Sequence, residues 1–196
     1  EPGGIDQAID SVRNAGPMGF LILLALLLFA ATWWYKSLSA DYSAPEAQDQ
    51  GQNSGEPAPD FTVYDGEGNA VKLSDFAGTP VVINFWATWC SPCKAELPAF
   101  EAAFQQYGEQ VHFMMVNMTD GARDTVDGVK DFVAGGEYSF PLYLDTELDA
   151  AYAYGVYSIP MTVFINADGS LYKSHSSMIS EEKLNNYIDA LIENNQ

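Results

Sequence analysis

The stretch Trp86-Ala-Thr-Trp-Cys-Ser-Pro-Cys-Lys-Ala-Glu-Leu-Pro98 contains both cysteines of the 196-residue chain. It follows a nearly continuous apolar run at residues 80–86, which is typical of a strand buried on both faces. It leads into residues 92–107, where apolar side chains recur at the spacing of one helical stripe. Cys90 and Cys93 are therefore predicted at the start of a helix, directly after a buried strand.

This position suits thiol-disulfide exchange. Free backbone N–H groups and the positive end of the helix dipole stabilise a thiolate at Cys90, which makes it the predicted nucleophile. Cys93 lies one turn further on, close enough to resolve a mixed disulfide formed on Cys90. Pro92 costs little in the first turn, because its missing N–H would have no helical partner anyway. A structural bridge is the alternative, but a bridge across two intervening residues restricts the unfolded chain very little.

Residues 57–196 show the pattern of a folded α/β domain. Beyond residues 80–86, the predicted strands are 60–64 and 70–73, which form a hairpin, then 111–116, 161–165 and an edge strand at 170–173. The predicted helices are 92–107, 124–134 and 180–192. Strands that alternate with helices favour one central sheet covered on both sides.

The composition excludes several classes of function. Against 27 Asp and Glu the chain has 8 Lys and Arg, so its formal net charge is −19 and its isoelectric point is near 4.1. A phosphate backbone would be repelled, which argues against nucleic-acid partners. Two cysteines and two histidines in unrelated contexts cannot complete a four-ligand zinc site, so we predict no metal site.

The N-terminal segment is predicted to be a membrane anchor. Residues 14–35 carry no charged side chain, and a helix of that length crosses roughly 30 Å of hydrocarbon. Trp33, Trp34 and Lys36 would form the interfacial belt at its end. The alternative is a cleaved signal peptide, for which Ser37-Leu38-Ser39 could serve as the cleavage motif.

We therefore expect four segments: an N-terminal flank at 1–16, a transmembrane helix at 17–36, a flexible acidic linker at 37–56 and the folded domain at 57–196. The linker has scarcely an apolar side chain, and as a flexible coil it would reach about 25 Å. Positive charges on the two sides of the helix do not decide its orientation. The absence of Lys and Arg between Lys36 and Lys72 suits a translocated flank. Because the chain opens with Glu1 rather than Met, what precedes it is left open.

At the cysteine motif the chain resembles the thioredoxin superfamily, and specifically the membrane-tethered, extracytoplasmic thiol-disulfide reductases of the TlpA/ResA type. Pro98, eight residues after Cys90, matches the proline that kinks the active-site helix of thioredoxins. Ser158-Ile-Pro-Met-Thr-Val163 matches the segment whose proline is cis in the family. The resemblance implies a thioredoxin-like fold, with a central mixed sheet flanked by helices. The hairpin and an insertion at 120–145 look like TlpA-type additions.

The resemblance also implies roles for residues outside the dithiol. A cis bond between Ile159 and Pro160 would leave the backbone of Ile159 exposed for an extended substrate to pair with. An ordinary trans proline that opens a strand is the alternative. Apart from the resemblance, Trp86 and Trp89 are most simply interpreted as packing residues, with Trp89 also a candidate for the exposed rim that meets substrate.

The residues that could exchange protons with the thiols differ from those of thioredoxin itself. Where a thioredoxin carries a buried Asp, six residues before the first cysteine, this chain has Asn84, which cannot take a proton. Glu96, three residues beyond Cys93, matches the acidic residue of the TlpA/ResA pattern. We assign it to tuning the pKa values of the thiols and to relaying the proton of the resolving thiol. The alternative is a solvated surface Glu.

The sequence thus predicts an extracytoplasmic, single-pass membrane-anchored thiol-disulfide oxidoreductase that acts as a reductant. Its expected substrates are protein disulfides, including the oxidised haem-attachment cysteines of apocytochromes c, and its expected electron donor is a membrane thiol-reducing partner. No diffusible cofactor is expected, because the two sulfurs store the two electrons. The rivals are an oxidase or isomerase on the same fold, a thiol peroxidase, and a non-catalytic tethered adaptor.

Overall fold

The computed structural model describes residues 21–22, 24–30, 32–34, 49–50 and 55–195. The chain divides into two compact units, residues 1–46 and residues 47–196. The described residues of the first unit are helical. Among the residues that the structure describes, no helix combines the length and the apolar character that a bilayer crossing requires. The predicted flank, most of the predicted linker and parts of the predicted transmembrane helix lie outside the described residues.

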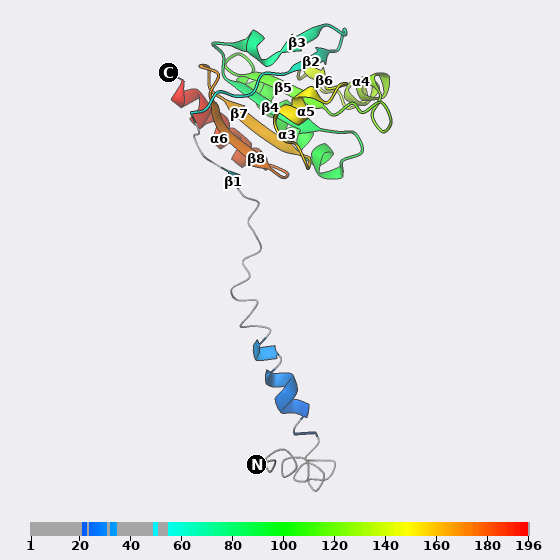
Figure 1. Cartoon of the computed structure of the whole chain (residues 1–196), viewed down its shortest axis with the longest axis vertical. Helices are drawn as coiled ribbons and strands as arrows, with labels where there is room; N and C mark the ends of the chain where they lie inside the picture. Colours follow the sequence, from blue (N-terminus) through cyan, green and yellow to red (C-terminus); the bar gives the residue numbers. More distant parts are fainter. Residues whose placement is uncertain (1–20, 23, 31, 35–48, 51–54, 196) are drawn as a thin grey trace, which may run out of the picture. The chain divides into compact units, whose positions relative to one another are not determined.

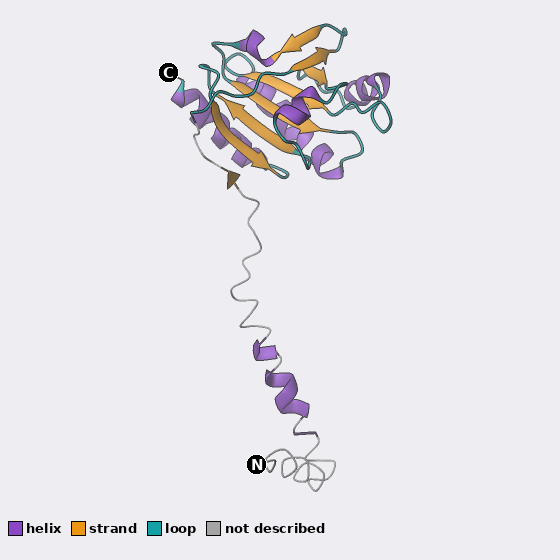
Figure 2. Ribbon diagram, in the orientation of Figure 1, coloured by secondary structure: helices purple, strands orange, loops and turns teal. Residues whose placement is uncertain are grey.

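The second unit is built on one mixed sheet of eight strands in the order β1-β8-β7-β4-β5-β6-β2-β3 (Figure 1). In chain order the strands are β1 (Asp49–Gln50), β2 (Thr62–Asp65), β3 (Ala70–Lys72), β4 (Val81–Trp86), β5 (His112–Asn117), β6 (Leu142–Leu144), β7 (Met161–Ile165) and β8 (Leu171–Ser176). The pairs β4–β5 and β5–β6 are parallel, and all the others are antiparallel. The strands form the layer drawn in orange in Figure 2.

Helices lie on both faces of this sheet. They are η1 (Leu73–Phe76), α3 (Ser91–Tyr107), α4 (Val126–Gly135), α5 (Asp149–Ala153) and α6 (Glu181–Asn194). Because successive side chains of a strand point to opposite faces, β4 supplies both cores. Val82 and Trp86 pack in the core with α3, α4 and α6, whereas Val81, Ile83 and Phe85 pack in the core with η1 and α5.

The structure confirms the predicted thioredoxin-like arrangement of a mixed sheet between helices. Three central strands and three long helices lie within about two residues of their predicted ends. The strand predicted at 170–173 is present as β8, but the prediction that it forms the edge of the sheet is wrong. β8 continues to Ser176, and its outer side pairs with Asp49 and Gln50, so the two-residue β1 is the edge. These two residues belong to the predicted linker.

Candidate active site

The two cysteines lie where β4 ends and α3 begins. Cys90 is the N-cap of α3, and its Sγ accepts a hydrogen bond of 3.2 Å from the backbone N–H of Cys93. A disulfide joins the two residues, whose Cα atoms are 5.3 Å apart. Cys93 is fully buried, whereas Cys90 is 5% exposed. The structure is therefore that of the oxidised protein, and Cys90 is the more exposed of the two cysteines, as predicted for the nucleophile.

A buried carboxylate holds the turn that presents Cys90. Asp124, just before α4, accepts hydrogen bonds from the backbone N–H of Thr88 at 2.9 Å and from the Thr88 hydroxyl. It also accepts one from the Asn117 side-chain amide at 2.9 Å. Sequence reasoning placed Asp124 at the start of a predicted helix, where an acidic residue is common and gives no signal that it is buried. Its contacts tie the insertion to the cysteine motif.

The segment before β7 forms the other side of the site. Ile159–Pro160 is a cis peptide bond, which confirms that prediction. Antiparallel pairing sets Met161 of β7 opposite Phe85 of β4, and this register brings the start of β7 beside the cysteine turn. The carbonyl oxygen of Ile159 lies 3.8 Å from Cys90 Sγ. An extended chain that reaches Cys90 would therefore pass along the backbone of Ile159.

Glu96 is buried, so the interpretation of it as a solvated surface residue is wrong. Its side chain is 2% exposed. Its Oε1 accepts a hydrogen bond of 2.8 Å from the Asn84 amide, and its Oε2 accepts one of 2.8 Å from the backbone N–H of Ile179. Burial raises the pKa of Glu96 from 4.5 to about 7, although both hydrogen bonds act to lower it. A carboxyl one turn from Cys93 is thus able to exchange a proton near neutral pH.

Asn84 fills the position of the thioredoxin aspartate with a neutral side chain. It is fully buried on β4, and its Nδ2 donates both to Glu96 and, at 3.2 Å, to the Thr162 hydroxyl on β7. An aspartate here would place a second acidic group in contact with Glu96, which would disfavour ionisation of both. A neutral Asn84 therefore suits a buried Glu96, because the contact between them then contains one titratable group instead of two.

The two tryptophans of the motif have different environments. Trp86 is fully buried and packs against Phe132, with ring centroids 5.7 Å apart. Trp89 is 42% exposed, and the guanidinium carbon of Arg123 lies 3.8 Å from its ring centroid. Asp120 holds this arginine through a 3.0 Å contact with its Nε. The rim position predicted for Trp89 is observed, and Arg123 is a part of it that sequence reasoning missed.

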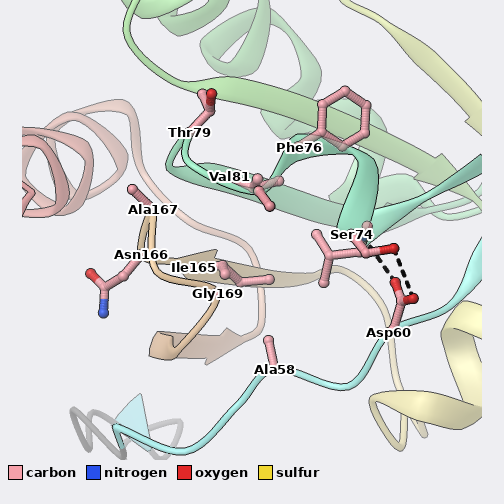
Figure 3. A pocket seen from close by; sticks show the side chains of 12 residues that line it. Ala58, Asp60, Ser74, Phe76, Thr79, Val81, Ile165, Asn166, Ala167 and Gly169 are labelled. Atoms are coloured by element: carbon pink, nitrogen blue, oxygen red, sulfur yellow. Dashed lines mark hydrogen bonds between the residues drawn. The ribbon is translucent and has the colours of Figure 1, made fainter.

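Two cavities lie at opposite ends of β4. The first, of about 390 Å³, adjoins Trp89 and Ile159 beside the dithiol. The second, of about 190 Å³, lies at the Val81 end between Asp60, Phe76 and Ile165, where Ser74 donates two hydrogen bonds to Asp60 (Figure 3). Within the described part of the chain, no group of three or more His, Cys, Asp or Glu side chains could hold a metal ion.

The fold and this geometry define a class: a thioredoxin-like protein with a redox-active cysteine pair opposite a cis-proline loop. The sequence profile of the AhpC/TSA family matches residues 54–174, and the chain belongs to that family. Its relatives in sequence include a protein named thiol-disulfide oxidoreductase ResA from Halalkalibacterium halodurans. The two are 32% identical, over 87% of this chain and 92% of the relative. The ResA of Bacillus subtilis is 31% identical, over 76% of this chain and 82% of the relative.

Solved structures agree with this assignment. StoA from Bacillus subtilis superposes with a TM-score of 0.59 at 26% identity, over 68% of this chain and 98% of that one. A secreted disulfide oxidoreductase from Mycobacterium tuberculosis has the same TM-score and identity, over 67% and 96% of the two chains. The chain is therefore a thiol-disulfide oxidoreductase of the thioredoxin-like type.

Proposed function

We propose that this oxidoreductase reduces disulfide bonds of protein substrates on the outer side of a cytoplasmic membrane. One observation carries the choice of a polypeptide substrate: Cys90 Sγ lies beside the backbone of Ile159, at the edge of a buried site that also contains Cys93. A backbone next to the reacting sulfur suits an extended polypeptide, which can pair with it by main-chain hydrogen bonds. A small disulfide would gain nothing from this arrangement.

The reaction takes two exchanges. In the reduced protein, the Cys90 thiolate attacks one sulfur of the substrate disulfide, the substrate S–S bond breaks, and the other substrate sulfur leaves as a thiolate that takes a proton. Cys93 then attacks Cys90 Sγ in the mixed disulfide, which releases the second substrate thiol and forms the Cys90–Cys93 bond. Two electrons pass from the protein to the substrate, and no diffusible cofactor is required. A thiol donor must return them before the next cycle.

Cys90 and Cys93 depend on their surroundings for these roles. The backbone N–H of Cys93 already donates to Cys90 Sγ, and the same hydrogen bond would stabilise the thiolate in the reduced protein. Glu96 is the group that would accept the proton of Cys93. It lies one turn along α3 and has a pKa of about 7 because it is buried. Ile159 and Pro160, with Trp89 at the rim, would form the contact surface for the substrate backbone.

The direction of electron flow and the identity of the partners rest on resemblance. Relatives that carry the name ResA support a thiol-disulfide exchange role, and the TlpA/ResA pattern suggests oxidised haem-attachment cysteines of apocytochromes c as substrates. The same pattern suggests a membrane thiol-reducing protein as the donor. An anchor at residues 17–36 would keep the domain near such a donor. The uncharged run and the exposed apolar side chains of its described helical residues support this part of the proposal.

Two measurements on the full chain test the proposal. The first is the reduction potential of the dithiol. A value near the roughly −270 mV of thioredoxin supports a reductase, whereas a value near the −120 mV of strong oxidants overturns that direction. The second is capture with Cys93→Ser, which leaves mixed disulfides on Cys90 unresolved. Proteins captured through Cys90 identify the substrates, and a Cys90→Ser/Cys93→Ser double variant is the matched control.

A further inference from the structure

Asp124, in the loop between β5 and α4, is a buried carboxylate that accepts hydrogen bonds from neutral groups. The residue is 2% exposed. The Thr88 backbone N–H, the Thr88 hydroxyl and the Asn117 side-chain amide donate to it, and none of these three donors carries a charge. Both of its oxygens act as acceptors, as they do in an ionised carboxylate. A buried charge with neutral partners costs stability, so a role in the reaction accounts for Asp124 better than a role in the fold.

The loop before α4 is shaped so that it holds Asp124 in place. Asp120 Oδ1 accepts hydrogen bonds of 2.7, 2.9 and 3.2 Å from three successive backbone N–H groups, those of residues 122–124. Gly121 has a φ of +72°, which glycine adopts without strain. Its N–H donates to the carbonyl oxygen of Asp124 at 2.9 Å. The position of the Asp124 carboxylate is therefore fixed by the loop backbone as well as by its own side-chain contacts.

One peptide group connects this carboxylate to Cys90. Its N–H, from Thr88, donates to Asp124 Oδ2 at 2.9 Å. Its carbonyl oxygen, from Ala87, accepts the N–H of Cys90 at 3.2 Å. Standard bond lengths then place the carboxylate within roughly 9 Å of the Cys90 backbone nitrogen. That distance is about one Debye length at 0.1 M salt, and the path between the two groups runs through the protein, so salt screens the interaction only weakly.

A negative charge at this distance acts on the reduced protein and not on the oxidised one. In the reduced protein, the N–H of Cys93 and the start of α3 favour a thiolate at Cys90. Asp124 opposes them, because a nearby like charge disfavours ionisation. In the disulfide the sulfurs are uncharged, so Asp124 has no such effect. Strong oxidants have a stabilised reduced form. A destabilised reduced form is the converse, and it favours the release of electrons to a substrate.

We propose that Asp124 is a positioning residue that holds a negative charge against the cysteine turn and thereby makes the dithiol a stronger reductant. The inference rests on the proposed function and deepens it, because it names a group that favours electron transfer toward the substrate. The effect grows with pH, since it depends on the fraction of Cys90 that is ionised. At the distance given above, one charge changes the acid constant of the other about tenfold.

The reduction potential of Asp124→Asn tests the charge by itself. Asparagine has the same size, its oxygen can accept from the Thr88 N–H, and its amide can donate to the Thr88 hydroxyl oxygen, so the turn keeps its contacts. The full chain, held in detergent, is equilibrated with dithiothreitol buffers at pH 9 and at pH 5. At pH 9 we expect the reduced form to be favoured about tenfold more in Asp124→Asn than in the wild type, which raises the potential by about 30 mV. At pH 5, where thiols are protonated, the two potentials should agree.

Controls separate the charge of Asp124 from its surroundings. The other ionisable groups around the turn are the same in both proteins: Lys94 and Glu96 on α3, Asp120 and Arg123 in the loop, and Tyr157 before the cis-proline. Asp127→Asn removes one negative charge at an exposed position of α4 and should leave the potential unchanged. If Asp124→Asn folded poorly, Asp124→Ala/Thr88→Val would remove the carboxylate together with the hydroxyl that it would leave unpaired, and should raise the potential as well.

The sign and the pH dependence of the change decide the matter. Equal potentials at pH 9 would show that the charge does not reach Cys90. A lower potential for Asp124→Asn would show that the turn had loosened and the thiolate had lost its N–H donor, so that Asp124 only supports the turn. A difference of the same size at pH 5 and pH 9 would exclude the thiolate as its cause. Each of these results overturns the inference and leaves the proposed function standing. A wild-type potential near roughly −120 mV would instead overturn the reductase direction, and with it the account of Asp124 as an aid to reduction.

Discussion

A titratable group shielded from solvent lies near each end of β4, Glu96 on α3 and the partly buried His112 on β5, and burial shifts their pKa values in opposite directions. At the Trp86 end, Glu96 contacts Asn84, and burial raises its pKa to about 7. At the Val81 end, His112 stacks on Phe76 with ring centroids 3.7 Å apart, and burial lowers its pKa to about 4. Burial favours the neutral form of both groups. For the acid this places the proton exchange near pH 7, whereas for the base it moves the exchange away from neutral pH.

This difference separates a reactive end from a structural end. Near neutral pH, Glu96 exists in both protonation states, which is what a group that accepts and returns protons needs. His112 is neutral under the same conditions, and its Nε2 lies 2.9 Å from the Tyr143 hydroxyl. The presence of a buried titratable group is therefore a poor guide to function. A better guide is whether burial moves the pKa of the group toward the working pH, as it does for Glu96, or away from it, as it does for His112.

The largest expected effect is a difference in activity between variants at the two ends of β4. Cys90→Ser removes the attacking sulfur, so reduction of a peptide disulfide should fall by about a thousandfold or more. His112→Phe, at the other end of the strand, should retain the wild-type rate. Insulin reduction, followed by turbidity at pH 7, measures both. A Cys90→Ser protein with substantial activity would contradict the catalytic role of the dithiol. A folded but inactive His112→Phe protein would contradict the interpretation of the Val81 end of β4 as purely structural.

A smaller effect concerns the proton at the reactive end. Glu96→Gln keeps the size of the side chain but cannot accept the proton of Cys93, so the resolving step should slow by about a hundredfold at pH 7. The alkylation rates of the two thiols can also be measured from pH 4 to 10. In the wild type their pH dependence should include a step near pH 7 from the titration of Glu96, and this step should be absent in Glu96→Gln. Glu109→Gln, at an exposed residue just beyond α3, is the matched control. Thiol titrations and rates that match the wild type would exclude Glu96 from the mechanism.

The same substitution should change how stability depends on pH. In the oxidised wild type, the pKa of Glu96 is about 7 in the folded protein, against an ordinary value of 4.5. Between these values the native state keeps a proton that the unfolded chain releases, so the free energy of unfolding falls as pH rises. The shift corresponds to about 3 kcal/mol. Relative to the wild type, Glu96→Gln should therefore gain about this much between pH 4.5 and 7 in urea melts. Parallel curves for the two proteins would contradict the raised pKa.

Sequence reasoning succeeded where a local pattern decides the structure. The apolar runs that became β4, β5 and β7, and the cysteines at the start of α3, follow from periodicity and from the helix N-terminus. The cis bond before Pro160 came from family resemblance, because an X-Pro dipeptide alone does not reveal its isomer. Strand β6 has three residues and α5 has five, and segments this short carry too little periodicity to be recognised unless a turn signal marks them, as the hairpin turn does for the three-residue β3.

The parts of the site that were missed depend on long-range contacts. Asp124 meets Thr88 across 36 residues, and Arg123 meets Trp89 across a similar separation. Nothing local distinguishes Arg123 from an ordinary charged loop residue, or Asp124 from an ordinary acidic residue at the start of a helix. The burial of Glu96 depends on Ile179, which lies 83 residues away. Spacing along α3 could indicate that Glu96 is near Cys93, but the environment that moves its pKa is a property of the folded chain.

The smallest expected effect lies at the structural end. The pKa of His112 falls from 6.5 to about 4 because burial disfavours its charged form. Between these values the unfolded chain binds a proton that the native state does not, so stability is fully present above pH 6.5 and is lost as pH falls toward 4. His112→Phe keeps a ring against Phe76 and removes this loss. Since the imidazole is partly exposed, the gain at pH 4 should be on the order of 1 kcal/mol. Tyr143→Phe, which keeps the imidazole but removes its hydroxyl partner, should retain the wild-type pH slope. Urea melts at pH 4, 5 and 7 decide the matter: if His112→Phe retained the wild-type slope, the acid sensitivity would come from other groups, and His112 would not be the neutral, structural counterpart of Glu96.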